Sequence, residues 1–396
     1  MTASPEYDLL IRGGVVVDPA QGIHGPRDVA LAGGVVAAVA EAIPPERARR
    51  VVDVGGRIVT PGLIDLHTHL FDRVSALGID VDRTCLARGV TTSVDAGTAG
   101  SITFPGFRDY CIRPARSRVY AFVNLASIGL ILDDGYELDG LRYADADSLA
   151  ATIEANRDIC LGIKVRVGTE HVGNYGFQAL DRTLEVAERI GTRVMVHITR
   201  PGVPLSEVFD RLRPGDIITH LLHGKGETVV RDGKVIPALW RATERGVTAD
   251  VGHGMGSFAF ATARAALADG FRPTTISTDL HAFSIDGPCF DLATTMTKML
   301  HLGMTLDEVV AATTVNAARA LGKQDQIGSL RPGLAADLAV FDLRAGEFSL
   351  VDCEQETLVA DQALVSRLTV LGGEIVASDL EGVAAPLSPS AASEPR

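Results

Sequence analysis

Short apolar segments of strand length recur about every 25 to 40 residues through the middle of the chain, and helix-like stretches such as Leu180–Ile190 and Pro237–Arg245 separate them. Strands that alternate with helices form parallel sheets. Eight such repeats favour closure of the sheet into a barrel over an open sheet. We therefore predict an α/β fold with a (β/α)8 TIM barrel at its centre. The expected strands are Ile58–Leu66, Thr91–Asp95, Val119–Leu125, Ile159–Val165, Arg193–Val196, Asp216–Thr219, Val247–Val251 and Thr274–Thr278.

The two ends of the chain share a second pattern, in which short runs rich in Val, Ile and Leu are broken by pairs of glycine. Gly13-Gly14, Gly33-Gly34 and Gly55-Gly56 interrupt the N-terminal runs, and similar runs return in 328–341 and 368–376. Glycine tolerates positive φ, so such pairs suit tight turns between strands. Neither end holds enough strands to close a core alone. We expect one small β-sandwich built from both ends.

These patterns divide the chain into three parts. We expect the β-sandwich domain to comprise residues 1–59 and 324–383, and the barrel to comprise residues 60–323. A length of 396 residues suits a barrel with an accessory module. Residues 384–396 are rich in Ala, Ser and Pro, which predicts a disordered tail.

Charge and cysteine usage narrow the partners and the compartment. The net charge of -13 repels phosphate backbones, so we expect a small-molecule substrate and no nucleic acid. No apolar run approaches the roughly 20 residues that span a bilayer, and no signal segment is visible, so we expect no membrane association. The five cysteines lack CxxC spacing, which argues against a disulfide framework or a thiolate zinc site and favours the cytoplasm.

Residue types that bind metal ions stand at the carboxyl ends of four expected strands. His67 and His69 end the first strand, His197 the fifth, His220 the sixth and Asp279 the eighth. In a barrel these ends meet at one mouth, where the active sites of such folds lie. His67 and His69 are two residues apart, so both side chains leave a strand on the same side and can reach one cation. Imidazole together with carboxylate suits zinc, manganese or iron.

Lys164 lies inside the apolar fourth strand, in Ile159-Cys-Leu-Gly-Ile-Lys-Val-Arg-Val. A buried ammonium is costly unless it is paired, and a buried lysine loses its proton readily. One interpretation is an ordinary lysine paired with Asp or Glu. The other, which we favour beside so many metal ligands, is a neutral amine that reacts with CO2. The carboxylated Lys164 would then bridge two divalent metal ions, with Zn²⁺ expected and Mn²⁺ as the alternative.

Several segments resemble those of a known superfamily. Val59-Thr-Pro-Gly-Leu-Ile-Asp-Leu-His-Thr-His resembles the opening signature of the amidohydrolase superfamily, and Gly333-Leu-Ala-Ala-Asp-Leu resembles its closing signature. The resemblance extends over essentially the whole chain. Within the superfamily the chain is most similar to the dihydroorotase-like subgroup labelled amidohydrolase/deacetylase. This narrower resemblance rests on Thr219-His-Leu-Leu-His-Gly-Lys, Asp250-Val-Gly-His-Gly-Met-Gly-Ser-Phe and Ser277-Thr-Asp-Leu-His.

The resemblance implies how the ligands divide between the two ions. One departure from the family concerns Ile163-Lys-Val-Arg, where similar enzymes tend to read Ile-Lys-Ala-Arg; the lysine is retained, so only its local packing differs. The resemblance implies that one ion is bound by His67, His69 and Asp279 and the other by His197 and His220, with Lys164 as the bridge.

A mechanism follows from two ions in one site. They would share a hydroxide and polarise an ester or amide carbonyl, because metal binding makes hydroxide available at neutral pH. Asp279 would be the catalytic residue that accepts the proton of the hydroxide and passes it to the leaving group. His223 is a weaker rival of His220 as a ligand. Candidate substrate contacts are Arg166, His253, His281 and Tyr175, against structural roles such as an ion pair at the barrel mouth for Arg166.

Four functions remain open at this point. The leading one is hydrolysis of a small carboxylate ester or amide by a deacetylase-like or deacylase-like enzyme, acting for example on an acetylated 2-hydroxy acid or an N-acyl amino acid. The nearest alternative is a cyclic amidohydrolase of the dihydroorotase, hydantoinase or imidase kind. A deaminase is disfavoured, since such enzymes commonly use one metal without a bridging lysine. An inactive dihydroorotase-like scaffold would lack ligands. The resemblance also implies a homo-oligomer.

Overall fold

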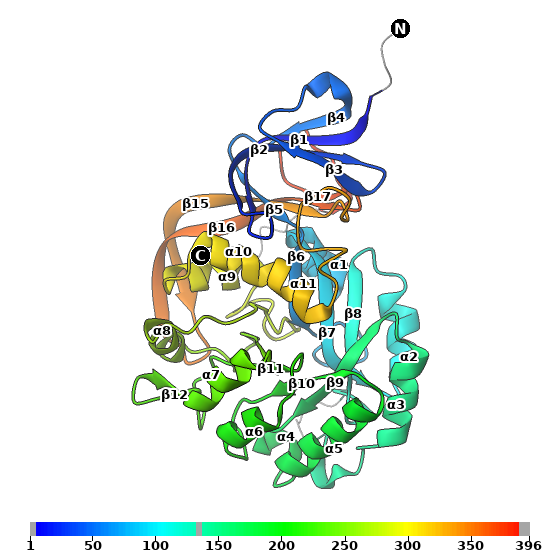
Figure 1. The fold of residues 1–396 in the computed structure, drawn as a ribbon, viewed down its shortest axis with the longest axis vertical. Helices are drawn as coiled ribbons and strands as arrows, with labels where there is room; N and C mark the ends of the chain where they lie inside the picture. The colour runs from blue at the N-terminus through cyan, green and yellow to red at the C-terminus, as the bar shows by residue number, and fades with distance from the viewer. Residues whose placement is uncertain (1–4, 132–136, 388–396) are drawn as a thin grey trace.

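The computed structural model describes residues 5–131 and 137–387. Its centre is a parallel sheet of seven strands that curls in the order β14-β11-β10-β9-β8-β7-β6 (Figure 1). Most of its Val, Ile and Leu side chains are buried, as expected of a parallel sheet covered by helices. The strands are β6 (Leu63–Thr68), β7 (Val90–Gly100), β8 (Arg118–Asn124), β9 (Cys160–Arg166), β10 (Arg193–His197), β11 (Ile217–Thr219) and β14 (Thr248–Ala249).

The eighth side of the barrel is formed by segment 274–280, which lies between β14 and β6. Single parallel bridges join it to both neighbours, Thr275 to Asp250 and Leu280 to Thr68. The predicted barrel is therefore confirmed, with its eighth side held by isolated bridges instead of a continuous ladder. Asp279 lies within this irregular segment, next to the bridge between Leu280 and Thr68. Its carboxylate therefore lies beside the first strand.

The expected first strand, Ile58–Leu66, is divided in two. Its first part, β5 (Ile58–Pro61), leaves the barrel and pairs with strands from both ends of the chain, whereas β6 enters the barrel. The division falls at Gly62, whose N–H donates to the carbonyl of Asp337. A Cβ at Gly62 would lie 2.2 Å from Oγ1 of Thr91, so only glycine fits there. One apolar run thus serves two sheets, which periodicity alone does not reveal.

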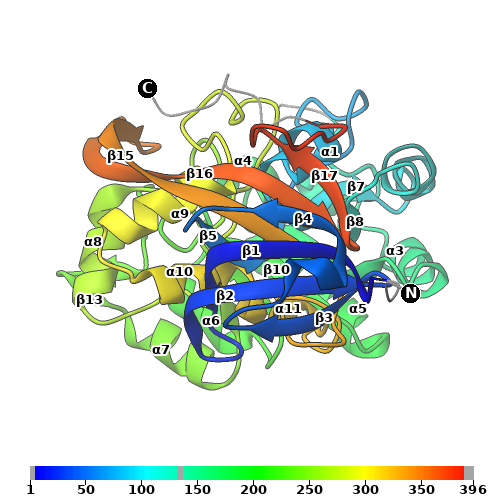
Figure 2. The ribbon, with the colours of Figure 1, turned by 90° about the horizontal axis from the view of Figure 1, so that it is seen from above.

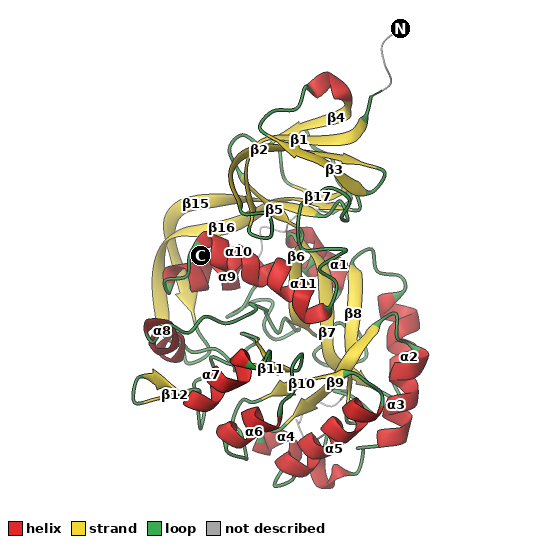
Figure 3. Cartoon of the chain, in the orientation of Figure 1, coloured by secondary structure: helices red, strands yellow, loops and turns green. Residues whose placement is uncertain are grey.

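Helices surround the barrel strands (Figure 3). α5 (Gly176–Arg189) turns one face inward, where Leu180, Thr183 and Ala187 recur at three- and four-residue spacing and are buried. Together with α7 (Pro237–Glu244), it confirms the two helical segments predicted from the sequence. The other helices of eight or more residues in the described ranges are α3 (Ala146–Ala155), α8 (Phe260–Ala268), α9 (Leu292–His301) and α10 (Leu306–Thr313).

Both ends of the chain build a second sheet in the order β17-β16-β15-β5-β1-β2-β3, with β4 paired to β1. Seen from above, the N-terminal strands and the C-terminal strands run side by side over the barrel (Figure 2). They share one buried cluster, which includes Leu9, Val29, Leu338 and Val370. The strands are β1 (Tyr7–Asp18), β2 (Ile23–Ala32), β3 (Val35–Ala40), β4 (Ala48–Asp53), β15 (Leu338–Val351), β16 (Thr357–Leu371) and β17 (Glu374–Ser378).

One of the glycine pairs does not separate strands. Gly33-Gly34 connects β2 to β3, but Gly13-Gly14 lies inside β1, where the register with β2 shifts between Ile11 and Gly14. A Cβ at Gly14 would meet the side chain of Val59 at 2.4 Å, so the bulge allows β5 to approach closely.

Part of the tail predicted from residue 384 onwards can be placed. Residues 388–396 lie outside the described residues. In 384–387, the N–H of Leu387 donates to Val376 and its carbonyl accepts from Ser378, so this segment follows β17. All five cysteines are free thiols. Among the described residues, no helix combines the length and the apolar character that a membrane crossing requires.

Phe341 on β15 tests how firmly the terminal sheet is attached to the barrel. Its ring is fully buried in the main core, against Gly89 at the entrance to β7. We expect Phe341→Ala to lower the free energy of unfolding by about 3–5 kcal/mol, the usual effect of emptying a buried aromatic site. Val359→Ala on the adjacent β16 is the control, since Val359 is 59% exposed and should change it by less than about 0.5 kcal/mol. Equal effects in denaturant titrations would show that the ring does not hold the sheets together.

Candidate metal centre

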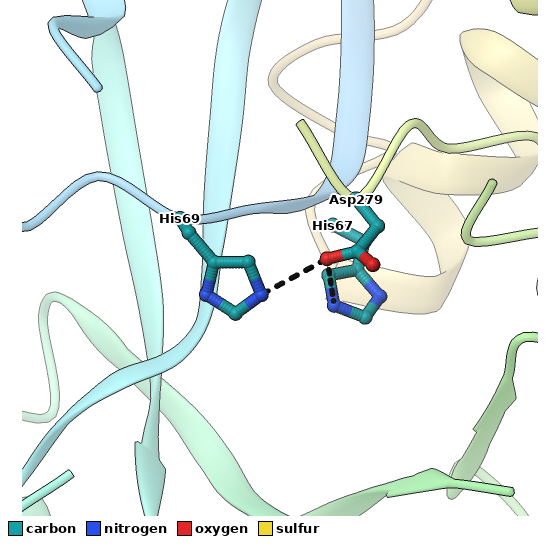
Figure 4. A group of neighbouring side chains, drawn as sticks. All are labelled: His67, His69 and Asp279. Carbon is teal, nitrogen blue, oxygen red and sulfur yellow. Dashed lines mark ion pairs between the residues drawn. The ribbon is translucent and has the colours of Figure 1, made fainter. Parts of the chain in front are cut away.

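The first group of ligands joins the first strand to the eighth side of the barrel. His67 is on β6, His69 is the first residue after β6, and Asp279 belongs to segment 274–280 (Figure 4). Oδ1 of Asp279 lies 3.2 Å from Nε2 of His67 and 2.9 Å from Nε2 of His69. One ligand atom from each residue lies within 4.8 Å of the others, so the group could hold a metal ion.

A second pair of imidazoles stands next to this group. His197 ends β10, His220 follows β11, and their ring centroids are 4.2 Å apart. Nε2 of each ring is buried and has no hydrogen-bond partner among the described residues. Leaving a buried polar nitrogen unpaired costs about 1–3 kcal/mol, and a bound cation would satisfy both. The rings of His67 and His220 are 4.8 Å apart, so the two groups are adjacent.

Lys164 stands between the two groups on β9. Its side chain is buried and its Nζ lies 3.1 Å from Nε2 of His67, so its polar contact is with an imidazole and not with Asp or Glu. Burial lowers the pKa of Lys164 to about 8. A Cβ at Gly97, which has φ of +81°, would lie 2.5 Å from Cβ of Lys164. Glycine at this position therefore leaves room for the lysine to enter the barrel.

Burial sets the protonation of the ligands. Desolvation lowers the pKa of His67 and His197 well below the ordinary value, and lowers the pKa of His220 to about 3. All three rings are therefore neutral at pH 7, the form that binds metal. Burial alone would raise the pKa of Asp279, but the adjacent His67 and His69 hold it well below its usual range. The carboxylate is ionised.

Asp279 is held in an unusual backbone conformation, with φ of +50°. Asp65 on β6 fixes the preceding residue, since it accepts the N–H of Thr278 at 3.0 Å and its hydroxyl at 2.5 Å. On the other side, the N–H of Gly254 donates to the carbonyl of Thr278. A Cβ at Gly254 would lie 2.3 Å from Oδ2 of Asp279. The carboxylate is therefore enclosed from both neighbouring strands.

Two of the four candidate substrate contacts line the same cavity as the ligands. Arg166 makes a two-pronged ion pair with Glu137, with both distances at 2.5 Å. This is the ion pair at the barrel mouth that stood as the alternative to substrate binding. His281 also faces the cavity, and its Nδ1 lies 2.6 Å from the carbonyl of Asp279.

The other two candidates lie elsewhere. His253 is buried outside the cavity, stacked on Phe258, and its Nε2 is 2.7 Å from Nζ of Lys298. Gly252 and Gly254 flank His253 with positive φ, and its ring faces Lys298 instead of the cavity. Tyr175 precedes α5, is 42% exposed, and does not line the cavity. His253 and Tyr175 therefore lie away from the candidate ligands, and their roles as substrate contacts stay predictions.

The cavity at the barrel mouth measures about 110 Å³. A larger hollow of about 660 Å³ is lined by residues from 70–82 and 106–119, and none of the predicted ligands lines it. His223, the rival of His220, does not face the small cavity. The small cavity is lined by His67, His69, Leu77, Leu130, Lys164, Arg166, His197, His220, Asp279 and His281.

The sequence did not predict the residues that contact Nδ1 of His67 and His69. Nδ1 of His67 meets the hydroxyl of Thr219, and Nδ1 of His69 meets the hydroxyl of Thr98. Each threonine donates to a fully buried carboxylate, Asp250 or Asp95. The available signal was an acidic residue inside an apolar strand, in Thr92-Ser-Val-Asp95 and Thr248-Ala-Asp250-Val.

Comparison with known proteins shows the family to which this chain belongs. A model of the amidohydrolase family matches residues 58–376, which is most of the chain. The chain belongs to the amidohydrolase family. A deacetylase of Agrobacterium fabrum is 35% identical to this amidohydrolase over 354 residues, covering 89% of this chain and 87% of the relative. This amidohydrolase is a hydrolase of ester or amide bonds.

Solved structures extend the likeness to the whole fold. A crystal structure of a dihydroorotase superposes with a TM-score of 0.84 at 34% identity, covering 93% of this amidohydrolase and 97% of the other chain. A crystal structure of an adenine deaminase superposes with a TM-score of 0.86 at 31% identity, covering 93% and 99%. Family members generally use divalent metal ions, which agrees with the His67, His69 and Asp279 group.

Gly254 offers a test of how tightly Asp279 is enclosed. We expect Gly254→Ala to abolish binding of one metal equivalent, because the new Cβ would displace Oδ2 of Asp279 and because φ of +56° strains alanine by about 1–2 kcal/mol. Metal content after gel filtration measures the effect. Gly256→Ala is the matched control in the same loop, since its Cβ would meet only Nζ of Lys225, at 3.4 Å. Full metal content in Gly254→Ala would contradict this account of the enclosure.

Proposed function

We propose that this amidohydrolase holds two divalent ions, expected to be Zn²⁺ with Mn²⁺ as the alternative, and removes a small acyl group from a carboxylate ester or amide. One observation supports this most: Lys164 is buried between a His-His-Asp group and two imidazoles with unpartnered nitrogens. A single ion would leave either the His-His-Asp group or the pair of imidazoles without a cation. In this arrangement His67, His69 and Asp279 hold one ion, and His197 and His220 hold the other.

Lys164 is proposed to bridge the two ions as a carbamate. The reaction forms a bond between Nζ and the carbon of CO2 and releases one proton from nitrogen, so it requires a neutral amine. Burial favours that form, as the lowered pKa of Lys164 shows. The carbamate adds a negative charge and two oxygen ligands in place of one nitrogen. Its two oxygens can each face one group of imidazoles.

Asp279 is proposed to move the proton during hydrolysis. When bound, two divalent ions supply hydroxide at neutral pH and polarise the carbonyl of the substrate. The ionised carboxylate of Asp279 lies at the cavity wall with its Oδ1 toward the imidazoles. It is placed to accept a proton on the cavity side and to donate that proton to the departing oxygen or nitrogen. His281, held at the backbone of Asp279, faces the same space.

The size of the cavity supports a small acyl group. About 110 Å³ must admit the reacting carbonyl and its substituent, and Leu77 and Leu130 supply its apolar wall. The similarity to a deacetylase agrees with an acetyl group. The reading as a deacetylase or deacylase acting on an acetylated 2-hydroxy acid or an N-acyl amino acid therefore leads.

A cyclic amidohydrolase is the second candidate. It is favoured by the likeness to a dihydroorotase at 34% identity over nearly the whole chain. The same ligands serve both reactions, so the metal centre does not separate them. The likeness to an adenine deaminase adds a third substrate class, although a bridging lysine argues for a two-ion hydrolase.

A substrate panel with metal analysis tests the proposal. We expect the zinc-loaded protein to hydrolyse acetylated 2-hydroxy acids or N-acetyl amino acids faster than dihydroorotate, hydantoin or adenine, and to lose activity with a chelator. Preference for a cyclic amide would replace the leading function with the second candidate. A protein that binds no divalent ion and hydrolyses none of these compounds would be a scaffold instead.

Asp279→Asn is the active-site variant for the same panel. We expect kcat to fall by about a hundredfold to ten-thousandfold, the usual contribution of a general acid–base group, because the amide cannot take up the proton. Bound metal is measured in the same preparation, so that loss of a ligand is not mistaken for loss of the base. Near-normal kcat in a fully loaded variant would exclude the proposed role of Asp279.

The carbamate is tested by labelling. Protein prepared with zinc and 13C-bicarbonate is expected to show one carbamate carbon signal by 13C NMR, because only Lys164 combines burial with the metal ligands. Lys164→Arg, which keeps the positive charge but cannot form the carbamate, should lack the signal and retain at most one zinc. A signal that persists in Lys164→Arg would place the carbamate elsewhere.

A further inference from the structure

The imidazole of His67 is linked to a buried carboxylate through one hydroxyl group. Its Nδ1 lies 2.8 Å from Oγ1 of Thr219, and the same Oγ1 donates to Oδ2 of Asp250 at 2.8 Å. Thr219 is on β11 and Asp250 follows β14, so the link reaches across the barrel from the first strand. All three side chains are buried.

The imidazole of His69 is linked in the same way on the other side. Its Nδ1 lies 2.7 Å from Oγ1 of Thr98, which donates to Oδ2 of Asp95 at 2.6 Å. Both Thr98 and Asp95 are on β7, and both are buried. Two ligands of one proposed ion are therefore each followed by a threonine and then an aspartate, although these residues come from different strands.

The hydroxyl of each threonine has one proton, and the contacts decide where it points. An ionised carboxylate only accepts hydrogen bonds. Asp250 receives three hydroxyl groups, from Thr219, Thr275 and Ser277. The proton of Thr219 is therefore committed to Asp250, and its oxygen can only accept from His67. Nδ1 of His67 must then carry the proton, which leaves the lone pair on Nε2.

A third candidate ligand, His220, follows the same rule. Nδ1 of His220 lies 2.7 Å from the carbonyl of Gly252, which has no proton to give. Its Nε2 is the buried nitrogen without a partner. In all three rings the Nδ1 side is occupied by an acceptor, and Nε2 faces the ligand cluster.

We propose that Thr219 and Thr98 are positioning residues that hold His67 and His69 in the tautomer whose Nε2 binds the metal ion, with Asp250 and Asp95 fixing the direction of each hydroxyl. Partners behind a ligand histidine typically change metal affinity by ten- to hundredfold when they are removed. Without the threonine oxygen, the proton of His67 is free to move to Nε2, where it blocks binding.

Thr219→Val tests the link with almost no change of shape. We expect the Kd for Zn²⁺, measured by competition with a chromophoric chelator, to rise by about ten- to hundredfold for one equivalent. Thr219→Ser restores the hydroxyl and should return the Kd to within about threefold of wild type. The same pair of changes at Thr98, Val against Ser, repeats the test on His69.

Thr275→Val is the matched control. Thr275 also donates a hydroxyl to Asp250, at 2.7 Å, and is equally buried, but it touches no ligand imidazole. We expect Thr275→Val to lower Tm about as much as Thr219→Val and to leave the Kd for Zn²⁺ within about threefold. If both variants weaken zinc binding equally, or if Thr219→Ser does not restore it, the link does not act on the metal ligand and the proposal is overturned.

A second measurement needs no variant to fold. In the zinc-loaded wild-type protein, long-range 1H–15N correlations of the histidine rings should report a protonated Nδ1 and a zinc-bound Nε2 for both His67 and His69, and binding of zinc through Nδ1 of either ring would overturn the proposal. The inference rests on the proposed metal centre, and the two can fail separately. A wild type that binds no Zn²⁺ defeats the metal centre, whereas tight binding with identical affinity in Thr219→Val defeats only the positioning role.

Discussion

The hydrogen bonds of Asp65 hold the first strand of the barrel to its eighth side. This carboxylate accepts both the N–H and the hydroxyl of Thr278, and the N–H of His67 points to the same Oδ1 at 3.3 Å. Segment 274–280 forms no continuous ladder with β6, so these side-chain contacts add to a backbone hydrogen bond from the N–H of His69 to the carbonyl of Leu280. Two ligands, His67 and Asp279, take their positions from this one buried group. Burial raises the pKa of Asp65 to about 7.

Much of the candidate ligand cluster could be predicted from the sequence, because the carboxyl ends of barrel strands converge at one mouth. His67, His197, His220 and Asp279 each followed an apolar run, and a barrel brings such ends to one mouth. The structure places all of them around one cavity, with Lys164 among them. The fold was also predictable, because strands and helices alternate along the chain. An error in the bounds of one strand does not change that alternation.

The remaining features depend on contacts that no spacing encodes. Thr219 meets His67 across 152 residues of chain, and Glu137 reaches Arg166 from the preceding loop. His253 ended an expected strand just as His220 did, but positive φ at its glycine neighbours accompanies a ring that faces away from the cavity. The division of Ile58–Leu66 was hidden because both halves are equally apolar. Local pattern predicts where a residue stands along a strand, but not which partner it meets.

The electrostatics of the barrel mouth also favour a cation. Three carboxylates are buried around the candidate ligands, Asp65, Asp95 and Asp250, and the partly buried Asp279 lies among them. Among the described residues that line the cavity, Lys164 is the buried amine. Hydroxyl and backbone donors satisfy the first three without adding positive charge. The neutral imidazoles add none. An ionised Asp279 in such a place leaves an excess of negative charge that a divalent ion would balance.

The terminal sheet reaches this centre through a second buried lysine, Lys298. Its Nζ lies 2.8 Å from the carbonyl of Val351 at the end of β15, and 2.7 Å from both Nε2 of His253 and the carbonyl of Pro288. The residue after His253 is Gly254, which closes over the carboxylate of Asp279. A chain of direct contacts therefore runs from the sheet built by both termini to the carboxylate of Asp279. The sheet is more than an appendage of the barrel, because Lys298 ties it to the loop that packs against this carboxylate.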